Sequence, residues 1–345
     1  MHGERKRHIG FGTETRMRRR DFITLLAGAI AASPSDSSAQ ETGRIYRLGV
    51  LWPFPRRTGA GSDDIPIALL EGLGRYGFIE GQNLTVDYRA WAPHLDLVSE
   101  YAAELVKVRA DVIAAGGDAA IRAAQQATQT IPILATTDDI IGRGLVRSMA
   151  RPEGNTTGVS ILATELDGKR QEILTEAVSG LRRIAILADA NATAVVQLQA
   201  LQEAARARNI EVSIHRIARG EEIPAAIDMA KASGATALNV LASPMLDTNR
   251  RIIMERVAAL RLPAIYQWPE AAEEGGFAAY GPRFTQIIRD VAARQLGQLL
   301  RGKKVADIPI EQPTKFEMVI NLKTAKSLGV EIPDTLLVRA DRVIE

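Results

Sequence analysis

The stretch that decides the fold class runs from Ala110 to Gly158 and reads ADVIAAGGDAAIRAAQQATQTIPILATTDDIIGRGLVRSMARPEGNTTG. It opens with a short apolar run at 112–115, which is typical of a buried strand. The run breaks at Gly116-Gly117, and Asp118 follows at a point where an aspartate can cap a helix extending from 119 to about 128. The first half of the stretch therefore predicts a strand, a tight turn and a helix in direct succession.

The second half of the stretch repeats this order. An apolar strand is predicted at 131–135, a polar loop at 136–139 and a helix at 140–150. Two parallel strands should therefore end side by side. In an open α/β sheet, ligands bind outside the carboxyl ends of the strands, where loops and helix N-termini expose unpaired N–H groups. We therefore expect the loops 116–119 and 136–141 to form one wall of a ligand cleft.

Length and charge limit the alternatives. The chain has 345 residues, of which 46% are apolar and 24% charged, so it can bury a full core and is long enough for two domains. Seven basic and four acidic residues precede Gln40, and the remaining chain has a formal net charge of −1. A nearly neutral body gives no electrostatic reason to expect nucleic-acid binding.

Motifs for catalysis, metals and cofactors are missing from the sequence. There are no cysteines, and the histidines at 2, 8, 94 and 215 do not have metal-ligand spacing. The chain contains no G-x-S-x-G, no phosphate loop of the form G-x-x-x-x-G-K-[ST] and no H-E-x-x-H, and Gly116-Gly117 alone does not make a dinucleotide fingerprint. We therefore predict a protein that is not an enzyme and binds neither a metal nor a cofactor.

Residues 1–39 have the pattern of an export signal. The pair Arg19-Arg20 precedes the apolar segment 23–32, and small residues follow up to a cleavage site near Ala39. Together with Phe22, the two arginines resemble a twin-arginine signal. The apolar segment is too short to span a bilayer of about 30 Å. We therefore expect a periplasmic, soluble monomer.

Two alternatives concern this N-terminal region. Residues 1–16 have no place in such a signal, so Met17 is an alternative start of the chain. The region can also be read as a disordered basic tail on a cytosolic protein.

Beyond residue 44 the chain alternates between strands and helices of ten or more residues, which predicts parallel sheets covered by helices on both faces. The alternation starts afresh after Gly158, so the fold class should be α/β with two doubly wound parallel-sheet lobes. We expect residues 44–157 plus 277–305 to form the N-terminal lobe and residues 158–274 plus 306–345 to form the C-terminal lobe. Three segments of the chain would then cross between the lobes and act as a hinge.

Four motifs, two of them within the stretch quoted above, resemble those of a known family. The family is the periplasmic substrate-binding proteins of ABC transporters with the type I binding-protein fold, which includes tryptophan- and tyrosine-type amino-acid receptors. The motifs are QQAT at 125–128 with TIPI at 130–133, GLVRSMARPEGNTTG at 144–158, GFAAYG at 276–281 and PIEQPTKFEMVIN at 309–321. The resemblance covers essentially the whole chain after the signal. It implies a receptor that closes on a small molecule and presents it to a permease in the inner membrane.

The candidate ligand contacts lie at predicted strand ends, loop tips and the second crossing. They are Trp52, Phe54, Gly117, Asp118, Ala119, Thr137, Asp139, Asn191, Ser243, Pro244, Met245, Tyr266, Trp268, Glu270 and Tyr280. Several have a structural alternative. Asp118 and Asp139 can serve as helix caps, Trp52 and Phe54 can pack in the core, and Trp268 can brace the hinge instead of stacking on a ligand.

The sequence supports one leading function and two alternatives. The leading hypothesis is a solute receptor of an ABC importer that captures a small carboxylate, such as an amino acid or an aromatic acid, by hinge closure. A ligand-sensing partner of a membrane kinase would use the same fold. An exported α/β enzyme is the second alternative, and it has no supporting motif.

Overall fold

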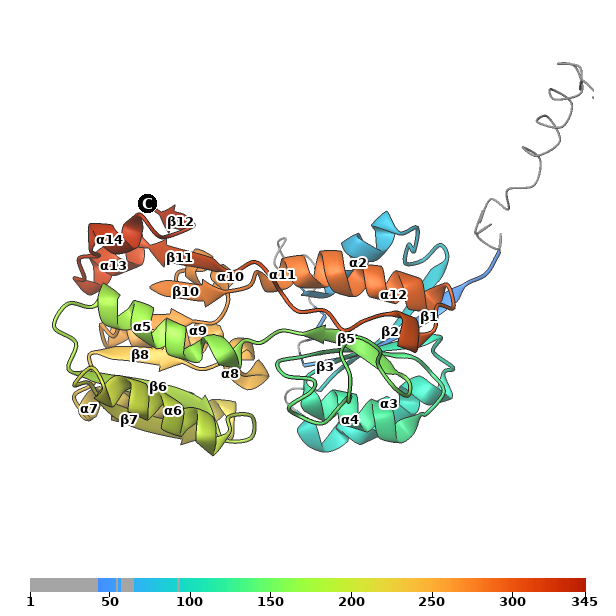
Figure 1. Cartoon of the computed structure of the whole chain (residues 1–345), viewed down its shortest axis with the longest axis horizontal. Coiled ribbons are helices and arrows are strands. Elements are labelled where there is room, and N and C mark those ends of the chain that lie inside the picture. Colours follow the sequence, from blue (N-terminus) through green and yellow to red (C-terminus); the bar gives the residue numbers. More distant parts are fainter. Residues whose placement is uncertain (1–42, 54, 57–64, 92–93) are drawn as a thin grey trace, which may run out of the picture. The chain divides into compact units, whose positions relative to one another are not determined.

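The computed structural model describes residues 43–53, 55–56, 65–91 and 94–345 (Figure 1). The predicted export signal at 1–39, the alternative start at Met17 and the candidate contact Phe54 lie outside these residues. From Ile45 onward the chain forms one unit. This unit contains two sheets, and Figure 1 shows β1 to β5 in one lobe and β6 to β12 in the other. The predicted α/β fold with two lobes is confirmed.

The first sheet has five parallel strands in the order β2-β1-β3-β4-β5. Its strands are β1 (Tyr46–Trp52), β2 (Leu84–Ala90), β3 (Val112–Gly116), β4 (Ile133–Thr137) and β5 (Thr156–Ser160). Helices α2 (Ile65–Arg75), α3 (Val98–Lys107) and α4 (Asp118–Ala127) connect them. Strands β3, β4 and β5 are buried along their whole length because helices cover both faces of the sheet, as expected for parallel strands.

The second sheet has seven strands in the order β12-β11-β10-β9-β8-β6-β7. Its strands are β6 (Arg183–Asp189), β7 (Glu211–Ile217), β8 (Ala237–Val240), β9 (Ala264–Tyr266), β10 (Ala278–Gly281), β11 (Glu317–Asn321) and β12 (Arg342–Ile344). Its helices are α5 (Asp167–Ala177), α6 (Val195–Arg206), α7 (Ile223–Ala232), α8 (Pro244–Thr248), α9 (Arg250–Ala259), α10 (Pro269–Glu273), α13 (Leu322–Leu328) and α14 (Asp334–Leu337). The expectation of purely parallel sheets is wrong at one place, because β10 and β11 pair antiparallel.

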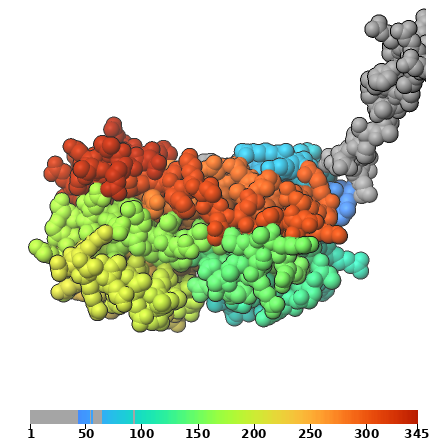
Figure 2. Space-filling model, viewed as in Figure 1, coloured from blue at the N-terminus to red at the C-terminus, as the bar shows by residue number. Residues whose placement is uncertain are grey.

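The chain passes between the lobes later than expected at each of three places. Strand β5 pairs with β4, so the first lobe extends through residue 160. Strand β10 pairs with β9 and β11, so residues 278–281 belong to the second lobe and not to the first. Glu311 bridges to Val159, which keeps residues up to 311 with the first lobe. In Figure 2 the orange-red segment before β11 and the green segment after β5 lie side by side on the surface.

Between the second and third crossings, a helical segment returns to the first lobe. It consists of α11 (Phe284–Gln286), a π-helical part (Ile287–Ala292) and α12 (Ala293–Leu300), and it packs with α2 on one face of the first sheet (Figure 1). In the part of the chain that the structure describes, no helix has the length and apolar character needed to cross a membrane.

Two local predictions in the central stretch are corrected. Residues 140–150 form a series of turns instead of a helix. Gly142 and Gly144 lower the helix propensity by roughly 1 kcal/mol each, and the Asp139 carboxylate accepts a hydrogen bond from the Gly142 N–H at 2.8 Å, which favours a turn. The N-cap of α4 is Gly117, and Asp118 is the first helical residue.

Candidate ligand-binding cavity

A cavity of about 1110 Å³ lies between the two lobes, where the carboxyl ends of both sheets face each other. Nearly every strand of the parallel part of each sheet contributes the residue at its end or just after it. From the first lobe these are Trp52, Trp91, Gly116, Gly117, Thr137, Asp138 and Ile161; from the second lobe they are Asp189, Ala218, Ala242 and Gln267. This is the location that an open α/β sheet offers to a ligand.

All three tryptophans of the chain line this cavity. Gly116-Gly117 gives two of them space. A Cβ at Gly116 would lie 2.8 Å from the indole of Trp52, and a Cβ at Gly117 would lie 3.0 Å from the indole of Trp91. Gly117 also has a φ of 84°, which a side chain would strain. The two glycines therefore leave the space that the rings of Trp52 and Trp91 occupy.

The third tryptophan, Trp268, is held by packing. Its ring stacks on Phe284, with centroids 4.8 Å apart and an interplanar angle of 18°. Both residues line the cavity and also belong to the core cluster that contains Trp52. Trp268 is therefore a buried, stacked part of the cavity wall, and its contact with Phe284 joins the second lobe to the helix that returns to the first.

The rim of the first lobe carries an ion pair. The Arg143 Nε atom lies 3.3 Å from Asp118 Oδ2, and the Thr137 hydroxyl donates to the other carboxylate oxygen of Asp118. Arg143 Nη2 also donates a 2.7 Å hydrogen bond to the carbonyl oxygen of Ala192, which lies in the second lobe. Arg143 therefore connects the two walls of the cavity.

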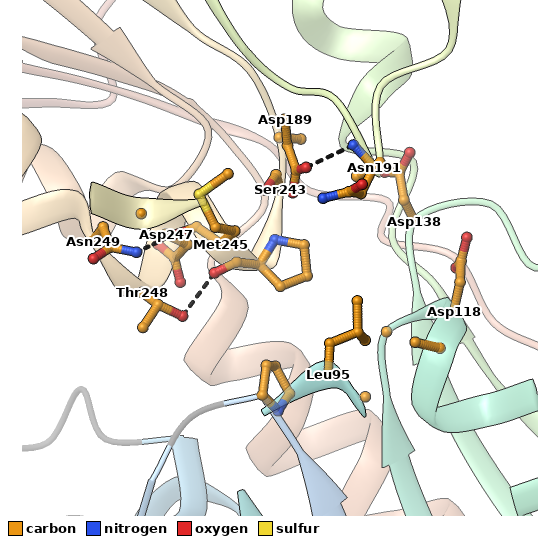
Figure 3. A pocket seen from close by; sticks show the side chains of 18 of the residues that line it. Leu95, Asp118, Asp138, Asp189, Asn191, Ser243, Met245, Asp247, Thr248 and Asn249 are labelled. Atoms are coloured by element: carbon orange, nitrogen blue, oxygen red, sulfur yellow. Dashed lines mark hydrogen bonds between the residues drawn. The ribbon is translucent and has the colours of Figure 1, made fainter. Parts of the chain in front are cut away.

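The opposite wall is organised around Asp189 at the end of β6. Its carboxylate accepts hydrogen bonds from the Asn191 N–H at 2.9 Å and from the Ser243 hydroxyl at 2.7 Å (Figure 3). The Ser243 hydroxyl in turn caps α8 by accepting from the Leu246 N–H. These bonds fix the polar groups of the second lobe before a ligand arrives.

Two further aspartates of the lining have a raised pKa. Burial raises the pKa of Asp138, although both of its oxygens accept hydrogen bonds from Thr164. Burial raises the pKa of Asp247 to about 6, and the positive charge of Arg250 partly opposes this rise. Asp247 is only partly buried and lines the cavity, so the charge of its carboxyl group can respond to the pH or to a bound ligand.

Ten of the candidate contacts lie in the cavity wall. They are Trp52, Gly117, Asp118, Ala119, Thr137, Asn191, Ser243, Pro244, Met245 and Trp268. Figure 3 shows Asp118 on one side of the pocket and Asn191, Ser243 and Met245 on the other. That they contact a ligand stays a prediction.

Asp139 and Tyr266 are placed away from the cavity wall. Asp139 bonds to the N–H of Gly142 within its own turn, and the preceding residue, Asp138, takes the position that was expected for it. Tyr266 is buried in the core of the second lobe and packs close to Gly276, where a Cβ would lie 2.8 Å from its ring.

Glu270 and Tyr280 are also absent from the lining. The carboxylate of Glu270 accepts from the N–H and hydroxyl of Thr285, at 3.2 and 2.9 Å, so it fastens the second crossing. Tyr280 lies on β10, and its ring faces Phe316, with centroids 6.4 Å apart. Both residues therefore make contacts within the segments that join the lobes.

The candidate set omits many lining residues with polar, charged or aromatic side chains, among them Trp91, Asp138, Arg143, Asp189 and Gln267. Trp91, Asp189 and Gln267 carry the signal that identified Trp52, a polar or aromatic side chain at the end of a strand. Arg143 had no such signal, because it lies in a turn that was expected to be a helix. Among the described residues, no group of three or more His, Cys, Asp or Glu side chains could hold a metal ion.

The fold and the cavity define a two-lobed ligand-binding protein of the type I periplasmic class. Similar solved structures include a conserved domain protein from Vibrio cholerae, with 23% identity and a TM-score of 0.78 over 87% of this chain and 100% of that chain. They also include an ABC domain from Streptococcus pneumoniae in complex with L-Trp, with 22% identity and a TM-score of 0.75 over the same shares. At this identity the likeness concerns the fold.

The chain belongs to the ABC transporter substrate binding protein family, whose model matches residues 59–344. A curated relative is the tyrosine-binding protein of Clostridioides difficile, which is 25% identical over 268 residues, or 76% of this chain and 75% of the relative. The resemblance in the four sequence motifs is thereby confirmed.

Proposed function

We propose that the protein is the solute receptor of an ABC importer and that it captures a small amphipathic carboxylate, such as an amino acid or an aromatic acid, by closure of its lobes. The observation that carries this proposal is a cavity of about 1110 Å³ that is lined by all three tryptophans and has charged side chains on both walls. The names of the L-Trp complex and of the tyrosine-binding relative support the same class of ligand.

The polar part of the cavity fits a molecule with charges of both signs. The first N–H groups of α4 have no acceptor within the helix and suit a carboxylate, and the guanidinium of Arg143 lies in the same wall. The carboxylates of Asp118, Asp189 and Asp247 suit an ammonium group. A zwitterion with an aromatic or apolar body would use both sets of groups and the tryptophans.

Export and transport complete the proposal. The twin-arginine pattern before Ala39 would deliver the protein to the periplasm as a soluble monomer. There the closed, ligand-bound form would dock on a permease of the inner membrane. Residues 44–160 with 282–311, and 161–281 with 312–345, would move as the two closing lobes.

A thermal-shift screen of residues 40–345 tests the ligand class. Amino acids, aromatic acids, dicarboxylates and sugars should be compared, because a ligand at 100 times its Kd adds about 2.7 kcal/mol of stability. We expect amino acids or aromatic acids to raise the melting temperature. Stabilisation by uncharged sugars alone would refute the carboxylate assignment.

Two measurements then test closure and the role of the aromatic wall. A bound ligand should change the tryptophan fluorescence, since every indole of the chain lines the cavity, and should reduce the radius of gyration in small-angle scattering. Trp268→Ala should weaken binding by roughly 1 to 3 kcal/mol through lost burial and stacking. Scattering curves that stay identical at saturation would contradict a closing receptor.

A further inference from the structure

The lining of the cavity is strongly acidic. Among the described residues that line it, six have a carboxyl side chain and two have a guanidinium group, and none is a lysine or a histidine. The acidic residues are Asp96, Asp118, Asp138, Asp189, Glu221 and Asp247, and the basic residues are Arg143 and Arg219. With all of these groups ionised, the lining has a formal net charge of −4. A cleft lined by one sign of charge attracts ligands of the opposite sign.

Both arginines of the lining are already paired with carboxylates of the protein. The Arg143 Nε atom lies 3.3 Å from Asp118 Oδ2. Arg219 forms ion pairs with Glu221, at 3.4 Å, and with Glu222, at 3.1 Å. The positive charges of the lining are therefore compensated within the protein, whereas the excess of negative charge is not.

Asp247 differs from the other carboxylates of the lining. Asp118, Asp138 and Asp189 accept hydrogen bonds from neighbouring residues, and Asp96 is exposed to solvent. Asp247 is partly buried, yet among the residues that the structure describes none donates a hydrogen bond to its carboxylate or forms an ion pair with it. Neither carboxylate oxygen of Asp247 is closed to solvent. A ligand in the cavity can therefore reach this group.

The nearby arginine does not neutralise Asp247, because its guanidinium is bound elsewhere. Arg250 Nε and Nη2 each donate a 2.7 Å hydrogen bond to the carboxylate of Glu274. Its Nη1 donates to the backbone carbonyl oxygen of Asp247 at 3.3 Å. Burial raises the pKa of the Asp247 carboxyl group, Arg250 opposes this rise, and the negative charges of Glu270 and Glu274 add to it. The surroundings of Asp247 therefore lack a positive charge that a ligand could supply.

The remaining lining suits an amphipathic cation. All three tryptophans line the cavity, and a cationic nitrogen within about 6 Å of the face of an indole ring is attracted by it. The cavity volume of about 1110 Å³ exceeds the roughly 300 to 1,000 Å³ of common small-molecule pockets. A ligand can therefore extend beyond an amino-acid head group and present a second charged group to the wall.

We propose that the receptor selects a ligand of net positive charge, with an ammonium or guanidinium group on its apolar body, and that the carboxylate of Asp247 holds this group. The inference rests on the proposed function, because it narrows the ligand class of the same cavity. It implies discrimination against neutral zwitterions of similar size.

The first test compares two amino acids by calorimetric titration of residues 40–345. The compounds 4-(aminomethyl)-L-phenylalanine and 4-methyl-L-phenylalanine have the same head group and ring, and only the first has an ammonium group on the ring substituent. We expect the first to bind at least about tenfold more tightly, because only its ammonium group can form a charge-assisted hydrogen bond with Asp247. Equal affinity, or tighter binding of the methyl compound, would overturn the proposal.

A fragment pair separates this inference from the proposed function. Benzylamine and benzyl alcohol have nearly the same size, and neither carries a carboxylate. In a ligand-observed NMR titration, benzylamine should bind several-fold more tightly than benzyl alcohol even if no amino acid or aromatic acid binds. If benzyl alcohol binds as well as benzylamine, selection of a cation is wrong, whatever the fate of the carboxylate assignment.

Two variants locate the charge that selects the cation. Asp247→Asn keeps the shape of the side chain and should remove most of the preference for benzylamine over benzyl alcohol. The matched control is Glu203→Gln, because Glu203 is exposed on α6 outside the lining and its replacement changes the net charge equally. This control should keep the preference. A preference that survives in Asp247→Asn, or falls equally in both variants, would refute the assignment to Asp247.

Discussion

Arg170 offers the sharpest test of how the segments that join the lobes are held. Its side chain is fully buried in α5 and forms an ion pair with Asp167, which is also buried. Arg170 Nη2 donates to the carbonyl oxygen of Ala163 at 2.6 Å, and Nη1 donates to that of Tyr280 at 3.1 Å. These two carbonyls flank the first and second crossings between the lobes. One guanidinium therefore holds two of the joining segments.

Replacing Arg170 by Met should destabilise the protein by about 3 to 5 kcal/mol, because it leaves the Asp167 carboxylate buried without its counter-charge. Urea denaturation of residues 40–345 at pH 7.5 measures this loss as a lower midpoint. A second variant, Arg170→Met with Asp167→Asn, should recover part of the loss, since asparagine keeps an acceptor for Gln197 without a charge.

The pH dependence gives an independent check. Burial raises the pKa of Asp167, and Arg170 opposes that rise. Because the folded-state pKa lies above the unfolded value, the cost of ionising Asp167 is absent at low pH and grows as the pH rises. The penalty of Arg170→Met should therefore shrink at acidic pH. A loss of less than 1 kcal/mol at pH 7.5, or a penalty that grows on acidification, would refute this reasoning.

Three further predictions concern the cavity and export. Asp247→Asn should stabilise the protein by roughly 1 to 2 kcal/mol above pH 6 and by much less near pH 4. The reason is that burial raises the pKa of Asp247 to about 6 and penalises only its charged form. Thermal melts between pH 4 and pH 8 measure this trend, and its absence would show that the aspartate is well solvated. Arg143→Ala should open the ligand-free protein, because it removes the hydrogen bond to Ala192 across the cavity; an unchanged radius of gyration in small-angle scattering would argue against this link. Replacing Arg19 and Arg20 by Lys should block export, and normal processing of that variant in cell fractions would exclude the twin-arginine route.

Sequence periodicity was sufficient for the fold because it reflects local physics. A short apolar run followed by a glycine turn and a helix can bury both faces only in a parallel sheet, and this order recurs along the chain. The same local logic placed strand-end residues such as Trp52 and Asn191 at the cavity. It failed within 140–150, where two glycines and the Asp139 side chain outweighed the apolar spacing.

Contacts between distant residues decided the rest. The observed crossings between the lobes differ from the predicted ones because β10 pairs with β11 and because Glu311 bridges to Val159. Neither pairing produces a signal in the local sequence. In the same way, Asp138 lines the cavity and Asp139 does not, because the Asp139 carboxylate accepts a hydrogen bond within its own turn.

The sequence by itself therefore determined the α/β class, the two lobes, the family and the edge of each sheet at which a ligand would bind. Only the tertiary structure decided which side chains line the cavity and which, like those of Asp139 and Tyr266, lie away from its wall. The physical reason is that backbone periodicity is set by neighbours along the chain, whereas the direction and pairing of a side chain are set by strand register and by residues far away in the sequence. The hydrogen bond from the Thr157 hydroxyl to the Ile308 carbonyl oxygen joins residues 151 positions apart.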